Sequence, residues 1–536
     1  MSEPILWGGK DAFMHMLAVG ATRSGKTATV LNPLIFQLLV QKKQGKKLGF
    51  SVIEPKGDLV REVKEYCDEM EIPYIYIDPE SEDTHRFNVM EGETEDVAEA
   101  TVAVLQSLFG KQEAFFQTVQ ELSSRNITKL IKELQGDDMD LLDVLVTLRS
   151  PEILKKRVQE LKNKDPNNEL IDFFENELLG SLSDRYRQLV LGLRAQLENI
   201  TSNKKLKKII TGKSDINIDE HLEHGGVLLV NSALGTLKKA GDSFGMFVIM
   251  HLQSATFRRP GDEKTRTPHF LVVDEYSRYI NPDIEMFLSI AASYKVAGVF
   301  ATQSLAQLEV ESGKISGRAM KQAIMTSCRN KIAFVGLSAK DAQEFADEFG
   351  KDRVIIRQST YRNRIFVPRW FPDTYRDTED EQYRFYPTYL QDGMPQFHYV
   401  CRLVNEGSPQ KPFEAVGQFV PRNWKEQRIW EKKKAKDVTD MVSRLFRSTK
   451  KEKPFLLPAP EHHDPTIYKD ISAIQRQVEM EERVNQERFT ATVEQAPSAP
   501  EEPFHMDEDH KIDEEEVQVV TVPDETKTLK NQDDFF

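Results

Sequence analysis

Short apolar runs alternate along the chain with longer stretches in which apolar residues recur every three or four positions. Short runs bounded by turn residues are typical of buried strands, and helical stretches between them favour a parallel sheet. The pattern therefore predicts an α/β fold with a mostly parallel sheet. The expected strands are Met14–Val19, Phe50–Glu54, Tyr74–Ile77, Val227–Asn231, Phe270–Asp274, Val299–Thr302 and Lys331–Val335.

A long helical stretch interrupts this alternation between residues 94 and 213. It has no convincing strand, and Ile127, Leu130 and Ile131 have the spacing of one helix face. We therefore expect an all-α domain at 94–213, inserted into a sheet domain formed by 1–93 and 214–420.

Charge separates the C-terminal region from the rest. The net charge is −14, and residues 454–536 alone hold 21 acidic against 7 basic side chains. Few aromatic or branched residues occur there, so we expect a disordered acidic tail. The preceding segment, 421–453, has 12 basic and 5 acidic residues. It could contact a nucleic-acid backbone, an acidic partner or anionic lipid, or simply form a solvated helix.

Localisation follows from what the sequence lacks. No apolar stretch approaches the roughly 18 residues of a membrane span, and no signal peptide pattern opens the chain. Cys67, Cys328 and Cys401 are far apart and form no C-x-x-C pair. We expect a soluble, cytoplasmic protein whose cysteines are free thiols of the core.

An octapeptide after the first predicted strand fits the pattern G-x-x-x-x-G-K-[ST] of a phosphate-binding loop. Its glycines let backbone N–H groups surround phosphate oxygens, Lys26 can reach the β- and γ-phosphates, and the Thr27 hydroxyl can bind Mg²⁺. ATP and Mg²⁺ are the expected cofactors. The loop residues are Gly20, Ala21, Thr22, Arg23, Ser24, Gly25, Lys26 and Thr27.

Two acidic residues end the predicted strand Phe270–Asp274. In a nucleoside triphosphatase, Asp274 would hold the Mg²⁺ shell and Glu275 would orient or deprotonate the attacking water. The alternative for this piece alone is a buried strand with two acids in the loop after it. Together with the loop, it predicts a catalytic site.

Several further motifs resemble the TraG/TraD coupling proteins of conjugation and type IV secretion. They are T-R-S-G-K at Thr22–Lys26, Asn32-Pro33, E-P-K-G-D-L at Glu54–Leu59, Asp78-Pro79, Phe87-Asn88 and T-Q-S-L-A-Q-L-E at Thr302–Glu309. The resemblance covers roughly residues 5–420. It implies a RecA/FtsK-like P-loop ATPase, a homo-oligomer that forms a hexameric ring. The implied function is delivery of relaxase-bound plasmid DNA to a membrane secretion channel, with Gln303 sensing the γ-phosphate.

The chain departs from the family pattern in two places. Family members usually begin with transmembrane helices, whereas here the loop begins at Gly20, so a partner is expected to recruit the protein to the inner face of the membrane. Ala292 stands where the family often has an arginine that could reach a neighbouring subunit. Such a residue can contribute about 10³–10⁵ in rate. The candidates to replace it are Lys295, ranked first, Arg318 and Arg329.

Two other functions remain open. An FtsK- or HerA-type DNA translocase would share the nucleotide chemistry but would not need the E-P-K-G-D and T-Q-S-L-A-Q-L-E motifs. A docking platform would use ATP binding only to assemble the ring. DNA-stimulated hydrolysis separates the two motors from the platform.

Overall fold

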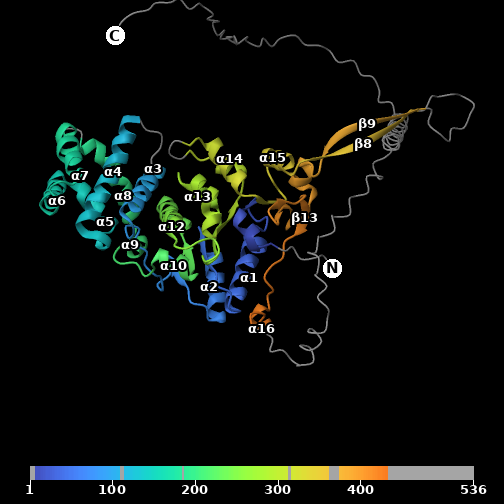
Figure 1. Cartoon of the computed structure of the whole chain (residues 1–536), viewed down its shortest axis with the longest axis horizontal. Helices are drawn as coiled ribbons and strands as arrows, with labels where there is room; N and C mark the ends of the chain where they lie inside the picture. Colours follow the sequence, from blue (N-terminus) through green and yellow to red (C-terminus); the bar gives the residue numbers. More distant parts are fainter. Residues whose placement is uncertain (1–6, 109–113, 184–185, 312–314, 361–373, 432–536) are drawn as a thin grey trace, which may run out of the picture. The chain divides into compact units, whose positions relative to one another are not determined.

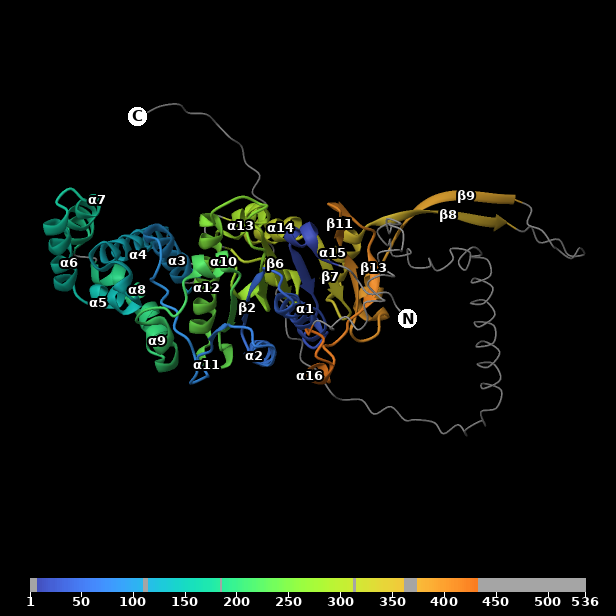
Figure 2. The same ribbon diagram turned by 60° about the horizontal axis from the view of Figure 1, so that its bottom comes forward.

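The computed structural model describes residues 7–108, 114–183, 186–311, 315–360 and 374–431. Its largest sheet has nine strands in the order β13-β10-β7-β1-β6-β5-β2-β4-β3. The seven strands from β7 to β3 are parallel, and β10 is antiparallel to both of its neighbours. Figure 2 shows β2, β6, β7 and β13 following one another across this sheet. The strands are β1 Met16–Val19, β2 Gly49–Glu54, β3 Ile75–Ile77, β4 Val227–Asn231, β5 His269–Val273, β6 Val296–Thr302, β7 Asn330–Phe334, β10 His398–Arg402 and β13 Phe413–Val416.

This sheet confirms the predicted α/β class. All seven predicted strands form, and their ends move by at most three residues. The strands β10 and β13 were not predicted. Two further strand pairs were also missed, β8 (Lys351–Thr360) with β9 (Thr374–Tyr383), and β11 (Val404–Asn405) with β12 (Ser408–Pro409).

Helices cover both faces of the sheet. Successive side chains of a strand point to opposite faces, so each strand contributes to two apolar cores. Leu17 and Ile53 belong to one apolar core, and their neighbours Ala18 and Val52 belong to the other. The helices α1 and α2 pack in the core of Ala18 and Val52, whereas α12 to α15 pack in the core of Leu17 and Ile53. Because the seven strands are parallel, their carboxyl ends lie along the same edge of the sheet.

The structure contains sixteen α-helices in its described part, and Figure 1 labels most of them. They are α1 Asn32–Lys43, α2 Asp58–Met70, α3 Thr94–Leu108, α4 Ala114–Gln135, α5 Leu141–Arg149, α6 Pro151–Lys164, α7 Glu169–Asp172, α8 Tyr186–Thr201, α9 Lys204–Ile210, α10 Ile218–His224, α11 Leu234–Leu237, α12 Lys239–Arg258, α13 Ile284–Ile290, α14 Gly317–Ser327, α15 Ala339–Phe349 and α16 Trp424–Gln427.

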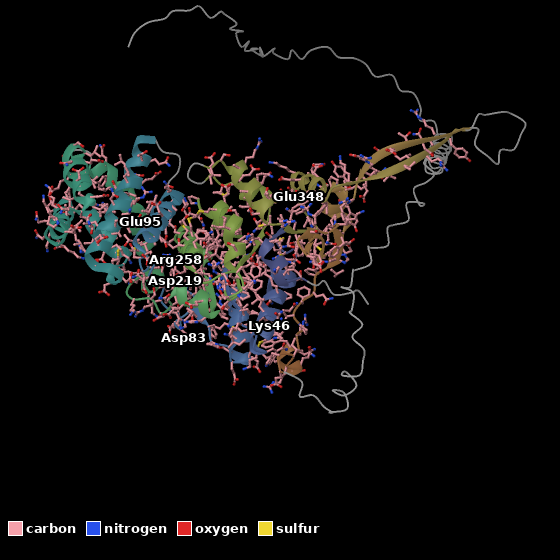
Figure 3. The ribbon with its side chains drawn as sticks, in the orientation of Figure 1. Lys46, Asp83, Glu95, Asp219, Arg258 and Glu348 are labelled. Atoms are coloured by element: carbon pink, nitrogen blue, oxygen red, sulfur yellow. The ribbon has the colours of Figure 1, made fainter. Side chains whose placement is uncertain are left out.

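Helices α3 to α9 follow β3 without a strand among the described residues and precede β4. Within this group α3 packs against α4, and it also packs against α12 beside the sheet. Arg258, at the end of α12, is ion-paired with Asp96 of α3 and lies 3.0 Å from Asp219 of α10 (Figure 3). The helical group is thus tied to the sheet through α12. Its independence as a domain stays a prediction.

The three cysteines are buried free thiols, as predicted. Across the described ranges, no helix is both long and apolar enough to cross a membrane. The predicted acidic tail, 454–536, and residues 432–453 of the basic segment lie outside the described residues.

Candidate functional site: a phosphate-binding loop facing two carboxylates

The octapeptide forms a tight loop between β1 and the first helical turns. β1 ends at Val19, and a π-helical segment, Lys26–Leu31, leads into α1. Arg23 (φ +67°) and Gly25 (φ +108°) are left-handed, a backbone that turns successive N–H groups inward. At Gly20 a Cβ would lie 2.6 Å from the Cβ of Phe334, so the loop can pass there only as glycine.

Lys26 is buried inside this loop. Its Nζ donates to the carbonyl oxygen of Gly20 at 2.6 Å and to that of Ala21 at 3.2 Å. Burial lowers the pKa of Lys26, and the nearby Asp274 and Glu275 partly offset this effect. The Ser24 hydroxyl is also buried and has no hydrogen-bond partner. A buried cation and a spare donor within a loop of inward N–H groups fit a phosphate chain.

The two predicted acids lie directly opposite the loop. Thr27 Oγ1 donates to Asp274 Oδ2 at 2.6 Å, which joins the carboxyl end of β5 to the start of the loop helix. Burial raises the pKa of Asp274, and the hydrogen bond from Thr27 opposes this rise. Glu275 has a left-handed backbone (φ +51°), which turns the chain sharply after the strand.

These oxygens fit a magnesium ion. Mg²⁺ in nucleotide sites is usually held by one or two protein oxygens together with phosphate and water oxygens. The Thr27 hydroxyl and the Asp274 carboxylate provide that set. The described residues contain no cluster of three or more His, Cys, Asp or Glu side chains that could hold a metal without a nucleotide.

Gln303 connects the loop with the acidic pair. It follows β6, which lies between β1 and β5 in the sheet. Its Nε2 donates to Glu275 Oε1 at 2.9 Å, and its Oε1 accepts from Thr22 Oγ1 at 3.1 Å. The Gln307 side chain holds Gln303 in turn, because its Oε1 accepts from the Gln303 N–H at 3.3 Å. Three adjacent strand ends are therefore bridged by one amide.

Glu54 lies close to this site, which the sequence did not predict. Glu54 ends β2, and its Oε1 accepts the N–H of Val60 at 2.8 Å in the first turn of α2. Burial, with a smaller contribution from Asp274, raises the pKa of Glu54 to about 7. The E-P-K-G-D-L motif contains Glu54, but nothing in its letters indicates that the acid is buried near Asp274.

The three basic residues that are candidates to reach the site of a neighbouring subunit do not contact the loop or the two acids. Lys295 precedes β6, so the length of that strand separates it from Gln303, and its Nζ lies 5.2 Å from the ring centre of Phe13. Arg329 precedes β7, and its guanidinium donates to the carbonyl oxygen of Gly407. Arg318 is exposed in the first turn of α14. The structure brings none of them together with the loop and acids through a hydrogen bond or ion pair among the described residues.

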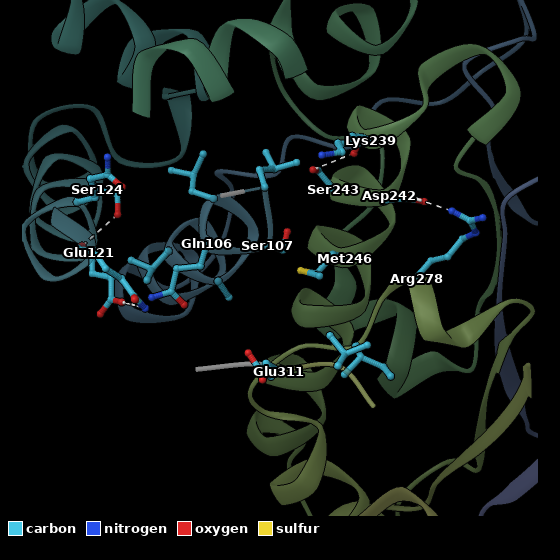
Figure 4. Close-up of a pocket in the computed structure, with 18 of the residues that line it drawn as sticks. Gln106, Ser107, Glu121, Ser124, Lys239, Asp242, Ser243, Met246, Arg278 and Glu311 are labelled. Atoms are coloured by element: carbon cyan, nitrogen blue, oxygen red, sulfur yellow. Dashed lines mark hydrogen bonds and ion pairs between the residues drawn. The ribbon is translucent and has the colours of Figure 1, made fainter. Parts of the chain in front are cut away.

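A separate cavity of about 590 Å³ lies between α3, α4 and α12. Asp242 of α12 and Arg278 line it together, joined at 3.3 Å, and Figure 4 shows this pair on the α12 side of the cavity. Burial raises the pKa of Asp242, and Arg278 opposes the rise. Arg278 follows Glu275 by three residues, so the cavity wall and the acidic pair share one short turn.

Part of the sequence and the fold of this chain are similar to those of known proteins. Residues 268–381 match the family model described as "TraM recognition site of TraD and TraG". No curated protein sequence matches the chain. Among solved structures, the unbound bacterial conjugative coupling protein TrwBdeltaN70 is 17% identical, with a TM-score of 0.56 over 77% of this chain and 87% of that one.

Two further structures of the plasmid coupling protein TrwB are similar. The complex with ADP and Mg²⁺ is 17% identical and the complex with the ATP analogue ADPNP is 18% identical. Both have a TM-score of 0.54 and cover 77% of this chain and 88% of that one. At this identity the shared property is the fold. The fold and the match at residues 268–381 together confirm the resemblance of this chain to the TraG/TraD coupling proteins.

Proposed function

We propose that this chain is an ATP-hydrolysing coupling protein, which recruits relaxase-bound plasmid DNA and delivers it to a type IV secretion channel during conjugation. The observation that carries the proposal is the bridge formed by Gln303 between Glu275 and Thr22. A hydrolytic motor needs a group that registers the nucleotide state and transmits it to the rest of the fold. Gln303 lies at that position, between the loop and the acid.

Each residue of the site then has a defined task. The loop N–H groups and Lys26 bind the phosphate chain, and Thr27 and Asp274 hold Mg²⁺. Bound Mg²⁺ supplies charge neutralisation for the phosphoryl oxygens. Glu275 orients the attacking water and accepts its proton. Lys26 has to leave the carbonyl oxygens of Gly20 and Ala21 for the phosphates, an exchange of neutral acceptors for charged ones that favours binding.

Gln303 couples this chemistry to movement. Its amide donates to Glu275 and accepts from Thr22, so it loses a partner whenever either residue turns toward a bound nucleotide. Because Gln303 is the second residue of the T-Q-S-L-A-Q-L-E segment, a change in its hydrogen bonds moves the chain that follows β6. That segment lies within the matched residues 268–381. Catalysis and partner recognition are therefore proposed to share one continuous stretch of chain.

The partners follow from the same match. The family model is described as a recognition site for TraM, which supports a DNA-processing protein complex as one partner. We further propose a homo-hexameric ring, single-stranded plasmid DNA as cargo, and a membrane protein that recruits the ring to the inner face of the membrane. The domain division follows this scheme, with nucleotide chemistry in 1–93 and 214–420 and the inserted helices 94–213 at one mouth of the ring.

Plasmid transfer from donor cells tests the proposal. The variant Glu275→Gln should abolish transfer while the chain still retains the relaxase and its DNA in a pull-down. The matched control is Glu285→Gln, which makes the same change at an exposed position of α13 and should leave transfer unchanged. Normal transfer by Glu275→Gln would contradict the proposal. Retention of DNA without any relaxase would instead favour a translocase of the FtsK or HerA type.

A further inference from the structure

Phe397, directly before β10, lies beside the phosphate-binding loop, and Phe419, shortly after β13, contacts Phe397. The Cδ1 of Phe397 is 2.7 Å from the position that a Cβ on Gly25 would occupy. A Cβ on Gly417 would collide with the side chain of Thr29, which lies on the helical segment that follows Gly25. The two approaches are connected, since the Gly417 N–H donates to the carbonyl oxygen of Phe397 at 2.9 Å. Residues 397 and 417 thus form one wall against the loop.

Phe397 of this wall forms an aromatic pair with Phe419. The rings of Phe397 and Phe419 are 5.1 Å apart with an interplanar angle of 82°, an edge-to-face contact. Phe419 is 53% exposed, and neither ring belongs to the two apolar cores of the described residues. Phe397 also has a left-handed backbone (φ +66°), which is costly for a bulky residue. Core packing therefore does not account for the position of either ring.

The position of the pair relative to the loop indicates a ligand. A nucleotide whose phosphates are bound by Gly20–Thr27 must place its base one ribose away from them. Phe397 contacts Gly25, near the end of the phosphate-binding loop, and the same wall contacts Thr29, just beyond the loop. Every nucleobase has an apolar π-face that stacks on aromatic side chains in a sequence-tolerant way.

We propose that Phe397 and Phe419 form the platform on which the purine base of the bound nucleoside triphosphate stacks. This inference rests on the proposed function, because it requires that the loop binds a nucleotide. Phe419 provides the exposed ring face, and Phe397 fixes that ring beside Gly25. Phenyl rings offer no hydrogen bonds to base edges, so the platform recognises an extended aromatic surface, which adenine and guanine both present.

The test compares two probes on the full chain, Mg·ATP and Mg·tripolyphosphate, which share the phosphates but differ in the base. Phe419→Ala should weaken Mg·ATP binding by about tenfold, the order expected for loss of one stacking contact, and leave tripolyphosphate binding unchanged. Phe419→Tyr should restore ATP binding. Val416→Ala removes another exposed apolar side chain from the same strand region and should change neither affinity.

The outcomes separate the platform from the phosphate site. Unchanged Mg·ATP affinity in Phe419→Ala would overturn the platform, and so would an equal loss for both probes, which would mean that the variant disturbs the loop. If Lys26→Ala bound both probes as tightly as the wild type, the phosphate site itself would be refuted, and the proposed function would fall with the platform.

Discussion

At the scale of single residues, the proposed mechanism gives Lys26 a role in nucleotide binding and Glu275 a role in hydrolysis. Lys26 lies within the loop, and in the proposed mechanism its charge faces the phosphates before and during the reaction. Glu275 contacts the side chain of Gln303 and acts only on the attacking water in the proposed mechanism. Interactions made only in the transition state affect turnover and not binding, so the two residues should fail in different ways when replaced.

We expect Lys26→Ala to abolish binding of Mg·ATP, since it removes the only lysine inside the loop. Glu275→Gln should bind Mg·ATP like the wild type and lower turnover by about 100-fold or more, the contribution typical of a general base. Calorimetric titration and steady-state phosphate release measure the two effects. Wild-type turnover in Glu275→Gln would refute the assignment of that residue.

The sequence was informative about these residues for a physical reason. Phosphate binding requires glycines and a lysine at fixed spacing along the chain, so Gly20, Gly25 and Lys26 can be recognised without the fold. The link between Thr22 and Gln303 joins residues 281 positions apart, and the wall formed by Phe397 joins residues still farther apart. Such contacts arise only when strands become neighbours in the sheet, and no local pattern predicts them.

The same reasoning applies at the scale of secondary structure elements. The seven buried parallel strands read as continuous apolar runs, because helices cover both of their faces. β10 and β13 lie at one end of the sheet, and β13 is only half buried or exposed along its length. β8 and β9 alternate many charged residues and resemble loops in sequence. The strand pair at this end of the sheet and the separate two-stranded pair lack continuous buried apolar runs. Prediction from apolar runs therefore misses them.

Glu54 connects two elements and makes the stability of the chain depend on pH. Its raised pKa of about 7 means that the folded state favours the protonated acid. The stabilisation is present below the ordinary pKa of the group and is lost as the pH rises through 7. Asp274 acts in the same direction, since burial also raises its pKa. The cost of burying the charged acid sets this dependence, because the hydrogen bond from Val60 favours the ionised form and opposes it.

The variant Glu54→Gln isolates this contribution, because its amide oxygen can still accept from Val60 and does not titrate. We expect the fall in unfolding free energy between pH 5 and pH 8 to be smaller in the variant, by up to about 3 kcal/mol. Denaturant titration at the two pH values measures it. The exposed Glu69→Gln on the same helix is the control. Identical pH dependence in Glu54→Gln and wild type would show that the acid is ionised throughout.

At the scale of the whole molecule, the proposed site is completed by a second subunit. Lys295 and Gln303 lie at opposite ends of β6, and a strand rises about 3.3 Å per residue, so roughly 25 Å separates them. Lys295 therefore cannot serve the site of its own subunit. A neighbouring subunit in the proposed ring could receive it, as it could receive the exposed Arg318.

Mixing inactive subunits tests this arrangement. If Lys295 acts on the neighbouring site, a mixture of Glu275→Gln and Lys295→Ala chains should recover up to about a quarter of wild-type hydrolysis, since random assembly pairs an intact site with an intact lysine at some interfaces. Phosphate release of each variant alone gives the baseline. Parallel mixtures with Arg318→Ala and Arg329→Ala are the comparison. Recovery only in one of those would transfer the role to that arginine.

The proposed function requires that nucleotide hydrolysis is coupled to DNA. The most direct measurement is the steady-state rate of phosphate release by the full chain, with and without single-stranded DNA, using Glu275→Gln to define the background. We expect DNA to raise the wild-type rate several-fold and to leave the variant at background. A wild-type chain that binds Mg·ATP but hydrolyses it at the same rate with and without DNA would refute a DNA-coupled motor and favour a nucleotide-dependent docking platform.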